Sequence, residues 1–173
     1  MRQNGLTLLE MVITLAIGAI LLGMAIPGYG YLVRGAQLSR LSSDLVSALA
    51  YARSEAIKRG ERVTVCKTGN AAPASPACQD DGGWQQGWIV FVDGGIKGEI
   101  DGSDEVLRVK SESTNAASVT VSNLSTYVSY LPSGLSRAPN NLPNGSINFC
   151  LEGEKRSVIL NVTGRVRSAA GSC

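Results

Sequence analysis

The chain has 173 residues, of which 17% are charged, and its formal net charge is only +2 at pH 7. This length suits one domain with a real hydrophobic core plus an appended element, and it excludes two substantial domains. The near balance of charge excludes a global field that would draw the protein to nucleic acid or to acidic membranes, so any such affinity must be local.

The residue types needed for most enzyme chemistry are also missing. The sequence has no histidine, and its four cysteines lack the paired short spacings of a zinc site. No pair of a nucleophile and a base is recognisable either. We therefore predict a protein that is not an enzyme and that holds no metal and no cofactor.

The first element in chain order is an almost wholly apolar segment, residues 6–26. At ~1.5 Å per helical residue it can cross a hydrocarbon layer of ~30 Å, so it predicts a membrane helix. Arg2 precedes the segment and no comparable basic cluster follows it, so the N-terminus should stay cytoplasmic and the rest should be exported. A secretory signal peptide is the alternative, but the residues after Ile26 do not form an A-x-A-like cleavage site.

Glu10 is the one ionisable side chain inside this apolar segment. A carboxyl in such a position costs about 2.5 to 3.5 kcal/mol on insertion scales and is usually kept for a purpose, so Glu10 should find a cationic partner. The alternative is a carboxyl near the membrane boundary that stays solvated or protonated.

The helix is expected to continue to residue 60. Beyond Pro27, where we expect a bend or a local break, apolar residues recur at the spacing of three or four that lines one helix face, namely Leu38, Leu41, Leu45, Leu49, Ala52 and Ala56. Lys58 and Arg59 then supply a basic last turn, and Gly60 supplies a glycine stop. Because a lone amphipathic helix frays in water, this half must bury its apolar stripe against the rest of the chain.

The remainder, residues 61–173, predicts a β-rich globular head. Linkers of Gly, Pro, Asn, Asp and Ser separate runs rich in β-branched and aromatic residues, at residues 62–67, 88–93, 106–110, 118–122, 126–131, 146–151 and 157–163. The expected fold class is therefore α+β, with a long N-terminal helix packed on an antiparallel sheet or pair of sheets.

The four cysteines should form disulfides, because export brings them to an oxidising compartment. Three connectivities are possible, and local pairing is favoured: Cys66 with Cys78 around a proline-containing loop, and Cys150 with Cys173 at the tail. The second bridge would hold the C-terminal segment against the head.

Two clusters in the head have both a functional and a structural interpretation. A glycine-rich loop gathers five acidic residues that could hold calcium but lack the spacing of an EF-hand, namely Asp93, Glu99, Asp101, Asp104 and Glu105. A solvated hairpin loop is the favoured interpretation. Trp84 and Trp88 could form a ligand platform, but tryptophans beside a hydrophobic strand favour core packing.

The segment after residue 153 is locally basic, since it sets four cationic side chains against one acidic side chain; the cations are Lys155, Arg156, Arg165 and Arg167. Arg165 and Arg167 are two residues apart, so in an extended strand both would point to one face and could contact phosphates. The alternative is that the segment closes the fold and that its arginines form surface ion pairs.

Residues 5–10, with the sequence GLTLLE, resemble the class III leader junction of type IV pilins and type II secretion pseudopilins. The resemblance implies that a prepilin peptidase removes residues 1–5 by cutting between Gly5 and Leu6, and that Leu6 becomes the N-methylated first residue. It also implies that Glu10 takes the place of the family's intramembrane glutamate. The partner of that glutamate in a filament would be the Leu6 amine of a neighbouring subunit.

Further stretches resemble the FimT, FimU and GspH group of minor pilins and pseudopilins, at residues 51–60, 84–93, 101–108 and 164–167. The resemblance implies a low-abundance subunit without catalytic activity that joins other minor pilins and the major pilin in priming the pilus, at its tip. Such a subunit crosses the inner membrane once with a periplasmic head and later enters the pilus outside the cell.

Two alternative functions follow from the same resemblance. One is a FimT-like minor pilin that binds DNA during natural transformation through Lys155, Arg156, Arg165 and Arg167. The other is the H-type pseudopilin of a type II secretion system.

Overall fold

A computed structural model of the chain describes residues 7–69, 76–102, 104–111 and 117–173, with the side chains of residues 24–28 excepted. The chain divides into two compact units, Met1–Ala36 and Gln37–Cys173. The predicted leader, residues 1–5, and its junction with Leu6 lie outside the described residues.

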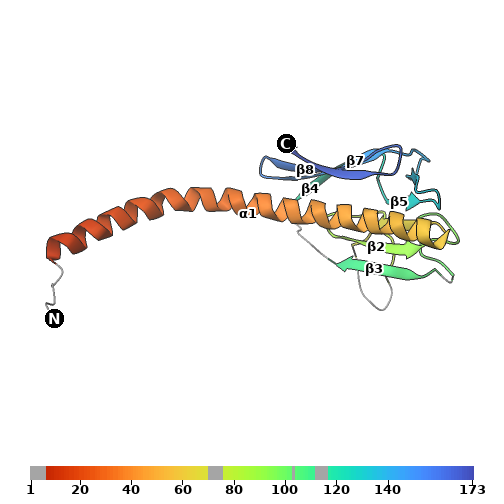
Figure 1. Cartoon of the computed structure of the whole chain (residues 1–173), viewed down its shortest axis with the longest axis horizontal. Coiled ribbons are helices and arrows are strands. Elements are labelled where there is room, and N and C mark those ends of the chain that lie inside the picture. The colour runs from red at the N-terminus through yellow and green to blue at the C-terminus, as the bar shows by residue number, and fades with distance from the viewer. Residues whose placement is uncertain (1–6, 70–75, 103, 112–116) are drawn as a thin grey trace. The chain divides into compact units, whose positions relative to one another are not determined.

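Helix α1 (Leu8–Arg59) is the longest element of the chain (Figure 1). It is continuous through Pro27, so the local break expected there is absent. A proline removes one backbone donor only, and the turns on either side keep theirs. The helix ends at Gly60, which has a left-handed φ of 72° and donates its N–H to the Ala56 carbonyl oxygen at 3.0 Å. This is the glycine stop that the sequence predicts.

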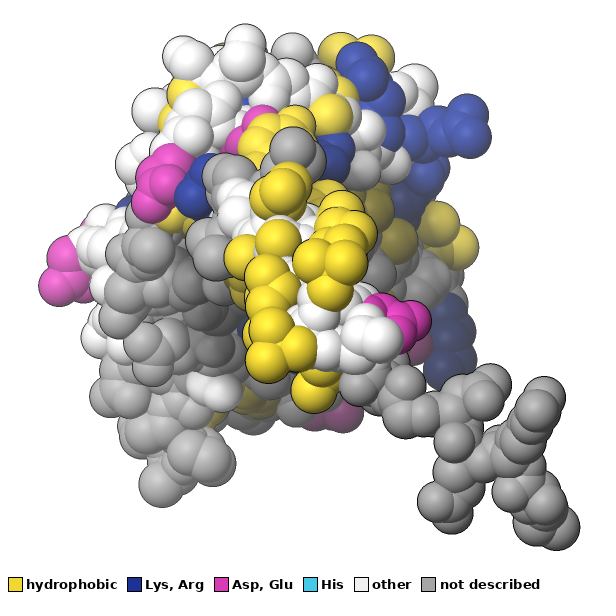
Figure 2. Space-filling model, turned by 90° about the vertical axis from the view of Figure 1, so that its left-hand side faces the viewer, with side chains coloured by type: hydrophobic (Ala, Val, Ile, Leu, Met, Phe, Trp, Pro, Cys, Tyr) yellow, Lys and Arg dark blue, Asp and Glu magenta, His cyan; other side chains and the backbone are white. Residues whose placement is uncertain are grey.

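In the first unit, large hydrophobic side chains are exposed along the described part of α1 (yellow in Figure 2), among them Leu8, Leu9, Leu15, Leu21 and Leu22. No helix among the residues that the structure describes combines the length and the apolarity needed to cross a membrane. The span predicted over residues 6–26 includes Leu6 and the side chains of residues 24–26, which lie outside the description, and it stays a prediction.

The second unit holds two antiparallel sheets. The five-stranded sheet has the order β3-β2-β1-β5-β6, with β1 Val63–Lys67, β2 Gly87–Val92, β3 Val106–Ser111, β5 Tyr127–Tyr130 and β6 Ser136–Arg137. The four-stranded sheet has the order β4-β7-β8-β9, with β4 Ser118–Ser122, β7 Gly145–Leu151, β8 Glu154–Leu160 and β9 Val166–Ser172. The seven predicted strands are present, although β8 begins and ends three residues before the predicted range of 157–163, and β6 and β9 were not predicted.

The two sheets share one hydrophobic core with the C-terminal part of α1. In Figure 1, β2 and β3 lie on one side of this part of the helix, and β7 and β8 lie on the other. Every residue of the predicted helix stripe is at most 1% exposed, namely Leu38, Leu41, Leu45, Leu49, Ala52 and Ala56. Residues of both sheets pack into the same core, including Val65, Val90, Val128, Ile147, Phe149, Val158 and Leu160. The predicted α+β fold, a long helix on antiparallel sheets, is confirmed.

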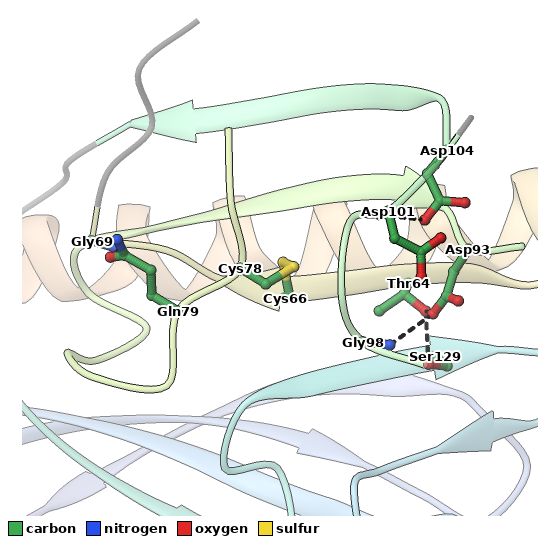
Figure 3. The surroundings of a disulfide bond; sticks show 10 residues. All are labelled: Thr64, Cys66, Gly69, Cys78, Gln79, Asp93, Gly98, Asp101, Asp104 and Ser129. Carbon is green, nitrogen blue, oxygen red and sulfur yellow. Dashed lines mark hydrogen bonds between the residues drawn. A yellow bond between two sulfur atoms is a disulfide. The ribbon is translucent and has the colours of Figure 1, made fainter. Parts of the chain in front are cut away.

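The other face of the five-stranded sheet carries a smaller core formed by Cys66, Ile89 and Phe91. Side chains of the covering segments pack against it, namely Cys78, Ile100, Val106 and Tyr127. A disulfide joins Cys66 of β1 to Cys78 (Figure 3), and a second joins Cys150 of β7 to Cys173. These are the two local pairings that the sequence predicts.

Candidate functional site: the arginines of β9 and the N-terminal helix

Arg165 and Arg167 lie where the chain enters β9, on either side of Val166. Val166 is half-buried and packs against the core, whereas both arginines are exposed. In the described part of the chain, neither guanidinium group forms an ion pair. An extended chain places residues two apart on one face at ~6.6 Å. Both groups can therefore contact an external anion such as a phosphate.

The turn before β9 fixes the position of Arg165. The Oδ1 atom of Asn161 accepts hydrogen bonds from the N–H groups of Thr163 at 3.1 Å and Arg165 at 2.9 Å. Gly164 has a left-handed φ of 76°, and a Cβ atom there would collide with the carbonyl oxygen of Gly134. The glycine before the arginines is therefore required by its own conformation and by the close approach of a neighbouring turn.

Arg53 of α1 ties both turns to the helix. Its Nε donates to the carbonyl oxygen of Gly134 at 3.1 Å, and its Nη2 donates to that of Thr163 at 3.1 Å. The motif at residues 164–167 thus divides in two. Gly164 closes the fold, while Arg165 and Arg167 face outwards.

Strand register separates the four cations proposed from the sequence. Lys155 of β8 lies opposite Gly171 of β9, so by strand alternation it shares a face with Arg167. Arg156 belongs to the opposite face, which is that of the buried Val158. The structure therefore brings Lys155 to the same outer face as the two β9 arginines, and it does not bring Arg156 together with them.

Two surface hollows meet at Arg165. One, of about 280 Å³, is lined by Ile159, Asn161, Arg165, Val166 and Arg167. The other, of about 330 Å³, lies between α1 and the entry to β9, where Arg53 and Ile57 line it together with Arg165. Cationic side chains beside open hollows can contact the phosphate backbone of a nucleic acid that lies across this surface.

Glu10 lies in the first turn of α1 and takes part in a capping pattern. Its N–H donates to Oγ1 of Thr7 at 3.2 Å, and residues 7–10 read Thr-x-x-Glu, as in a capping box. The side chain of Glu10 is exposed, and the described residues provide no ion pair for its carboxylate. A cationic partner would have to come from outside the described part of this chain.

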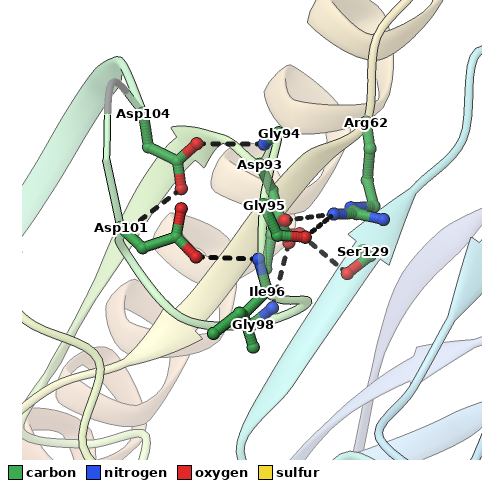
Figure 4. A network of polar contacts seen from close by, with 10 residues as sticks. Arg62, Asp93, Gly94, Gly95, Ile96, Gly98, Asp101, Asp104 and Ser129 are labelled. Atoms are coloured by element: carbon green, nitrogen blue, oxygen red, sulfur yellow. Dashed lines mark hydrogen bonds and ion pairs between the residues drawn. The ribbon is translucent and has the colours of Figure 1, made fainter.

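The acidic loop after β2 uses its carboxylates on its own backbone (Figure 4). Asp104 accepts hydrogen bonds from the N–H groups of Gly94 at 3.0 Å and Asp101 at 3.2 Å, and Asp101 accepts one from Ile96 at 2.8 Å. Across residues 7–69, 76–102, 104–111 and 117–173, no cluster of three or more His, Cys, Asp or Glu side chains is arranged so that it could hold a metal ion. These contacts favour the interpretation of this segment as a structural loop.

The two tryptophans belong to the core. Trp84 is 0% exposed and Trp88 is 3% exposed, and the Trp84 Nε1–H donates to the carbonyl oxygen of Leu124 at 2.9 Å. The prediction of core packing is confirmed for both rings.

The comparisons with known proteins cover both parts of the chain. Residues 41–164 match the family described as type II transport protein GspH, and residues 1–26 match the prokaryotic N-terminal methylation motif. A crystal structure of the type IV minor pilin FimU of Pseudomonas aeruginosa is similar in fold, with a TM-score of 0.57 and 15% identity over 82% of this chain and 98% of that chain. A second crystal form gives a TM-score of 0.52 and 14% identity over 79% and 99%. No curated protein matches this chain in sequence.

Proposed function

Because the chain belongs to the GspH family of type IV minor pilins and pseudopilins, we propose that it is a minor pilin that helps to prime pilus assembly at the pilus tip. The observation that carries the proposal is the presence of two matches on one chain, the methylation motif over residues 1–26 and the GspH family over residues 41–164. The exposed hydrophobic side chains of the first unit add support, since an apolar surface of this extent needs lipid or other helices around it.

The proposed route has three steps. First, a prepilin peptidase on the cytoplasmic side of the inner membrane removes residues 1–5, and the new amine of Leu6 is methylated. The subunit then crosses the inner membrane once, with its head in the periplasm. Last, its helix leaves the lipid and packs among the helices of other minor pilins and the major pilin. There Glu10 pairs with the Leu6 amine of a neighbour in a water-poor core.

Gly5→Val is expected to block removal of the leader, because the peptidase needs a small residue on the leader side of the cut. The mass of the membrane-extracted protein measures this, and the variant should retain residues 1–5. Gly18→Val is the matched control, since it makes the same change inside α1, where a Cβ atom meets nothing within 4 Å. A Gly5→Val product that still begins at Leu6 would refute the assigned junction.

The role of H-type pseudopilin is the first alternative, and the family description as a type II transport protein favours it. Deletion of the gene separates the two roles. Loss of surface pili with normal protein secretion supports the pilus role, whereas loss of secreted enzymes with normal pili supports the secretion role.

DNA binding is the second alternative, and the free outward arginines of β9 favour it. Arg165 and Arg167 stand ~6.6 Å apart along one face, and Lys155 lies on that face ~13 Å along the strand pair from Arg167. The cations that favour DNA binding lie on a sheet face and not on a helix that could enter a groove, so binding would be to phosphates and independent of sequence.

The double variant Arg165→Gln, Arg167→Gln is expected to remove most of the duplex DNA binding at low salt. For the unmodified chain, two or three phosphate contacts predict a slope of log affinity against log salt of about −2 to −3. Arg156→Gln is the matched control, since Arg156 lies on the other face and its loss should leave affinity unchanged. Thermal unfolding should change little in the double variant, because exposed arginines contribute about 0 to 1 kcal/mol. Normal DNA binding with a lowered melting temperature would instead assign these arginines to folding.

A further inference from the structure

We propose that a pocket of the second unit, separate from the β9 arginines, binds a small oxyanion, either a carboxylate or a phosphate. The pocket has a volume of about 150 Å³, and its polar lining comprises Arg62, Lys97, Tyr127, Ser129, Arg137 and Asn141. It shares no lining residue with the hollows beside Arg165. It is also independent of the role proposed above.

Positive charge exceeds negative charge in this pocket. Arg62 is neutralised, since its Nη2 donates to the buried carboxylate of Asp93 at 2.5 Å and to the carbonyl oxygen of Gly95 at 2.9 Å (Figure 4). Lys97 and Arg137 form no ion pair in the described part of the chain, and Arg137 donates only to the carbonyl oxygen of its neighbour Ser136 at 2.8 Å. Two cationic side chains therefore line the pocket without a carboxylate, which favours an oxyanion there.

Arg62 also has an N–H group, on Nε, that donates no hydrogen bond in the described structure. Its Nε atom is buried and has no hydrogen-bond partner in the described structure, although its Nη2 atom has two acceptors. Buried N–H groups without an acceptor are rare in proteins, and each such group calls for a ligand or an ordered water molecule. Because this Nε atom lies out of reach of water, an oxyanion in the pocket would supply the missing acceptor only if the Arg62 side chain shifts as the anion enters.

Two neutral groups can complete the set of donors. Burial, and then the nearby carboxylate of Asp93, raises the pKa of the Tyr127 hydroxyl, so this group stays protonated and can donate. Gly98 packs against the Tyr127 ring so closely that a Cβ atom would overlap it, and this contact fixes the ring. Asn141 has a left-handed φ of 61° in the turn after β6, and its carboxamide offers two further N–H donors.

Size and the apolar walls limit the ligand. Leu131, Ala138 and Pro139 form the remaining lining, and about 150 Å³ is well below the volume of a site for a drug-sized molecule. A phosphate ion or a short carboxylic acid fits this description, because either presents several oxygens in a few heavy atoms. A nucleotide base does not.

Calorimetric titration of the full chain in a nonionic detergent tests the proposal. Inorganic phosphate and succinate are titrated separately, at constant ionic strength and pH 7. Saturable binding of at least one of them is expected, and Arg137→Gln and Lys97→Gln should each weaken it about tenfold, the loss expected for one charged hydrogen bond. Binding of phosphate alone, or of succinate alone, identifies which oxyanion the pocket accepts.

Arg165→Gln is the matched control, because it removes one arginine from the other surface and should leave the affinity unchanged. Arg62 is not substituted, since its pairing with Asp93 supports the fold. Thermal unfolding of each variant verifies that its pocket is intact. Absence of saturable binding to both anions overturns the proposal, as does equal weakening by Arg165→Gln and Arg137→Gln.

Discussion

Gly164→Ala is expected to lower the free energy of unfolding by about 3 to 5 kcal/mol. A left-handed conformation costs an alanine about 1 to 2 kcal/mol, and the new methyl group would also displace the Gly134 turn and strain the two hydrogen bonds donated by Arg53. Urea unfolding of the full chain in a nonionic detergent measures the loss. The buried rings of Trp84 and Trp88 report the transition through their fluorescence.

Gly153→Ala is the control that isolates the collision from the backbone strain. Gly153 lies in the β7–β8 turn with a φ of 90°, and a Cβ atom there meets nothing within 4 Å. Its replacement should therefore cost only the conformational part, about 1 to 2 kcal/mol. Equal losses for the two variants would contradict the close approach of Gly134 to Gly164.

Glu10→Ala is expected to leave membrane insertion intact and to reduce incorporation into filaments at least about tenfold. The change removes the proposed partner of a neighbour's amine, and an uncompensated buried charge costs several kcal/mol. It also makes the segment more apolar, so insertion should not suffer. Fractionation of cells and sheared filaments at equal expression measures both quantities. Incorporation equal to that of the unmodified chain would show that Glu10 has no filament role.

Glu10→Gln distinguishes charge pairing from helix capping. Glutamine can take the glutamate position of a capping box, but it cannot pair as an anion with an amine. Under the proposed role Glu10→Gln fails as Glu10→Ala does, whereas normal incorporation of the glutamine variant would assign Glu10 to the cap. Thr14→Ala should incorporate normally, because the Thr14 hydroxyl donates only to the Met11 carbonyl oxygen of its own helix, at 2.9 Å.

Most of the fold could be predicted from the sequence because the deciding signals are periodic. The spacing from Leu38 to Ala56 marks one helix face, and the structure buries that face completely. Gly60 marks the helix end through its need for a left-handed φ. Seven strands were predicted because β-branched and aromatic residues gather in them, and turn residues bound them.

Strand β9 was missed because its own residues do not favour a strand. Residues 168–172 read Ser-Ala-Ala-Gly-Ser, and these small side chains have low strand propensity. What makes the segment extended is its pairing with β8 along all seven positions, which is a tertiary effect. The predicted strand at residues 157–163 was displaced for a related reason, since Asn161 and Thr163 form the turn that permits this pairing.

The placement of the cations also depends on register and on distant contacts. From the sequence, Arg156 and Lys155 were placed in one set of cations because they are adjacent in the chain. Adjacent residues of a strand, however, point to opposite faces of the sheet. The proposed oxyanion pocket is lined by Arg62, Lys97 and Arg137, which lie up to 75 residues apart in the sequence. No local sequence pattern therefore predicts the pocket. The two hydrogen bonds that Arg53 donates to the carbonyl oxygens of Gly134 and Thr163 also join distant segments, so they could not be predicted from the sequence either.

The central claim is that the chain is processed and built into a filament as a minor pilin, and the mass of the chain recovered from sheared filaments tests it most directly. Cells expressing the chain at its natural level are sheared, and the filament fraction is separated from membranes. We expect this fraction to contain the chain at low abundance beside the major pilin, as a product that begins at Leu6 and carries one added methyl group on its amine. Recovery of the chain from membranes alone, or with residues 1–5 still attached, would contradict it.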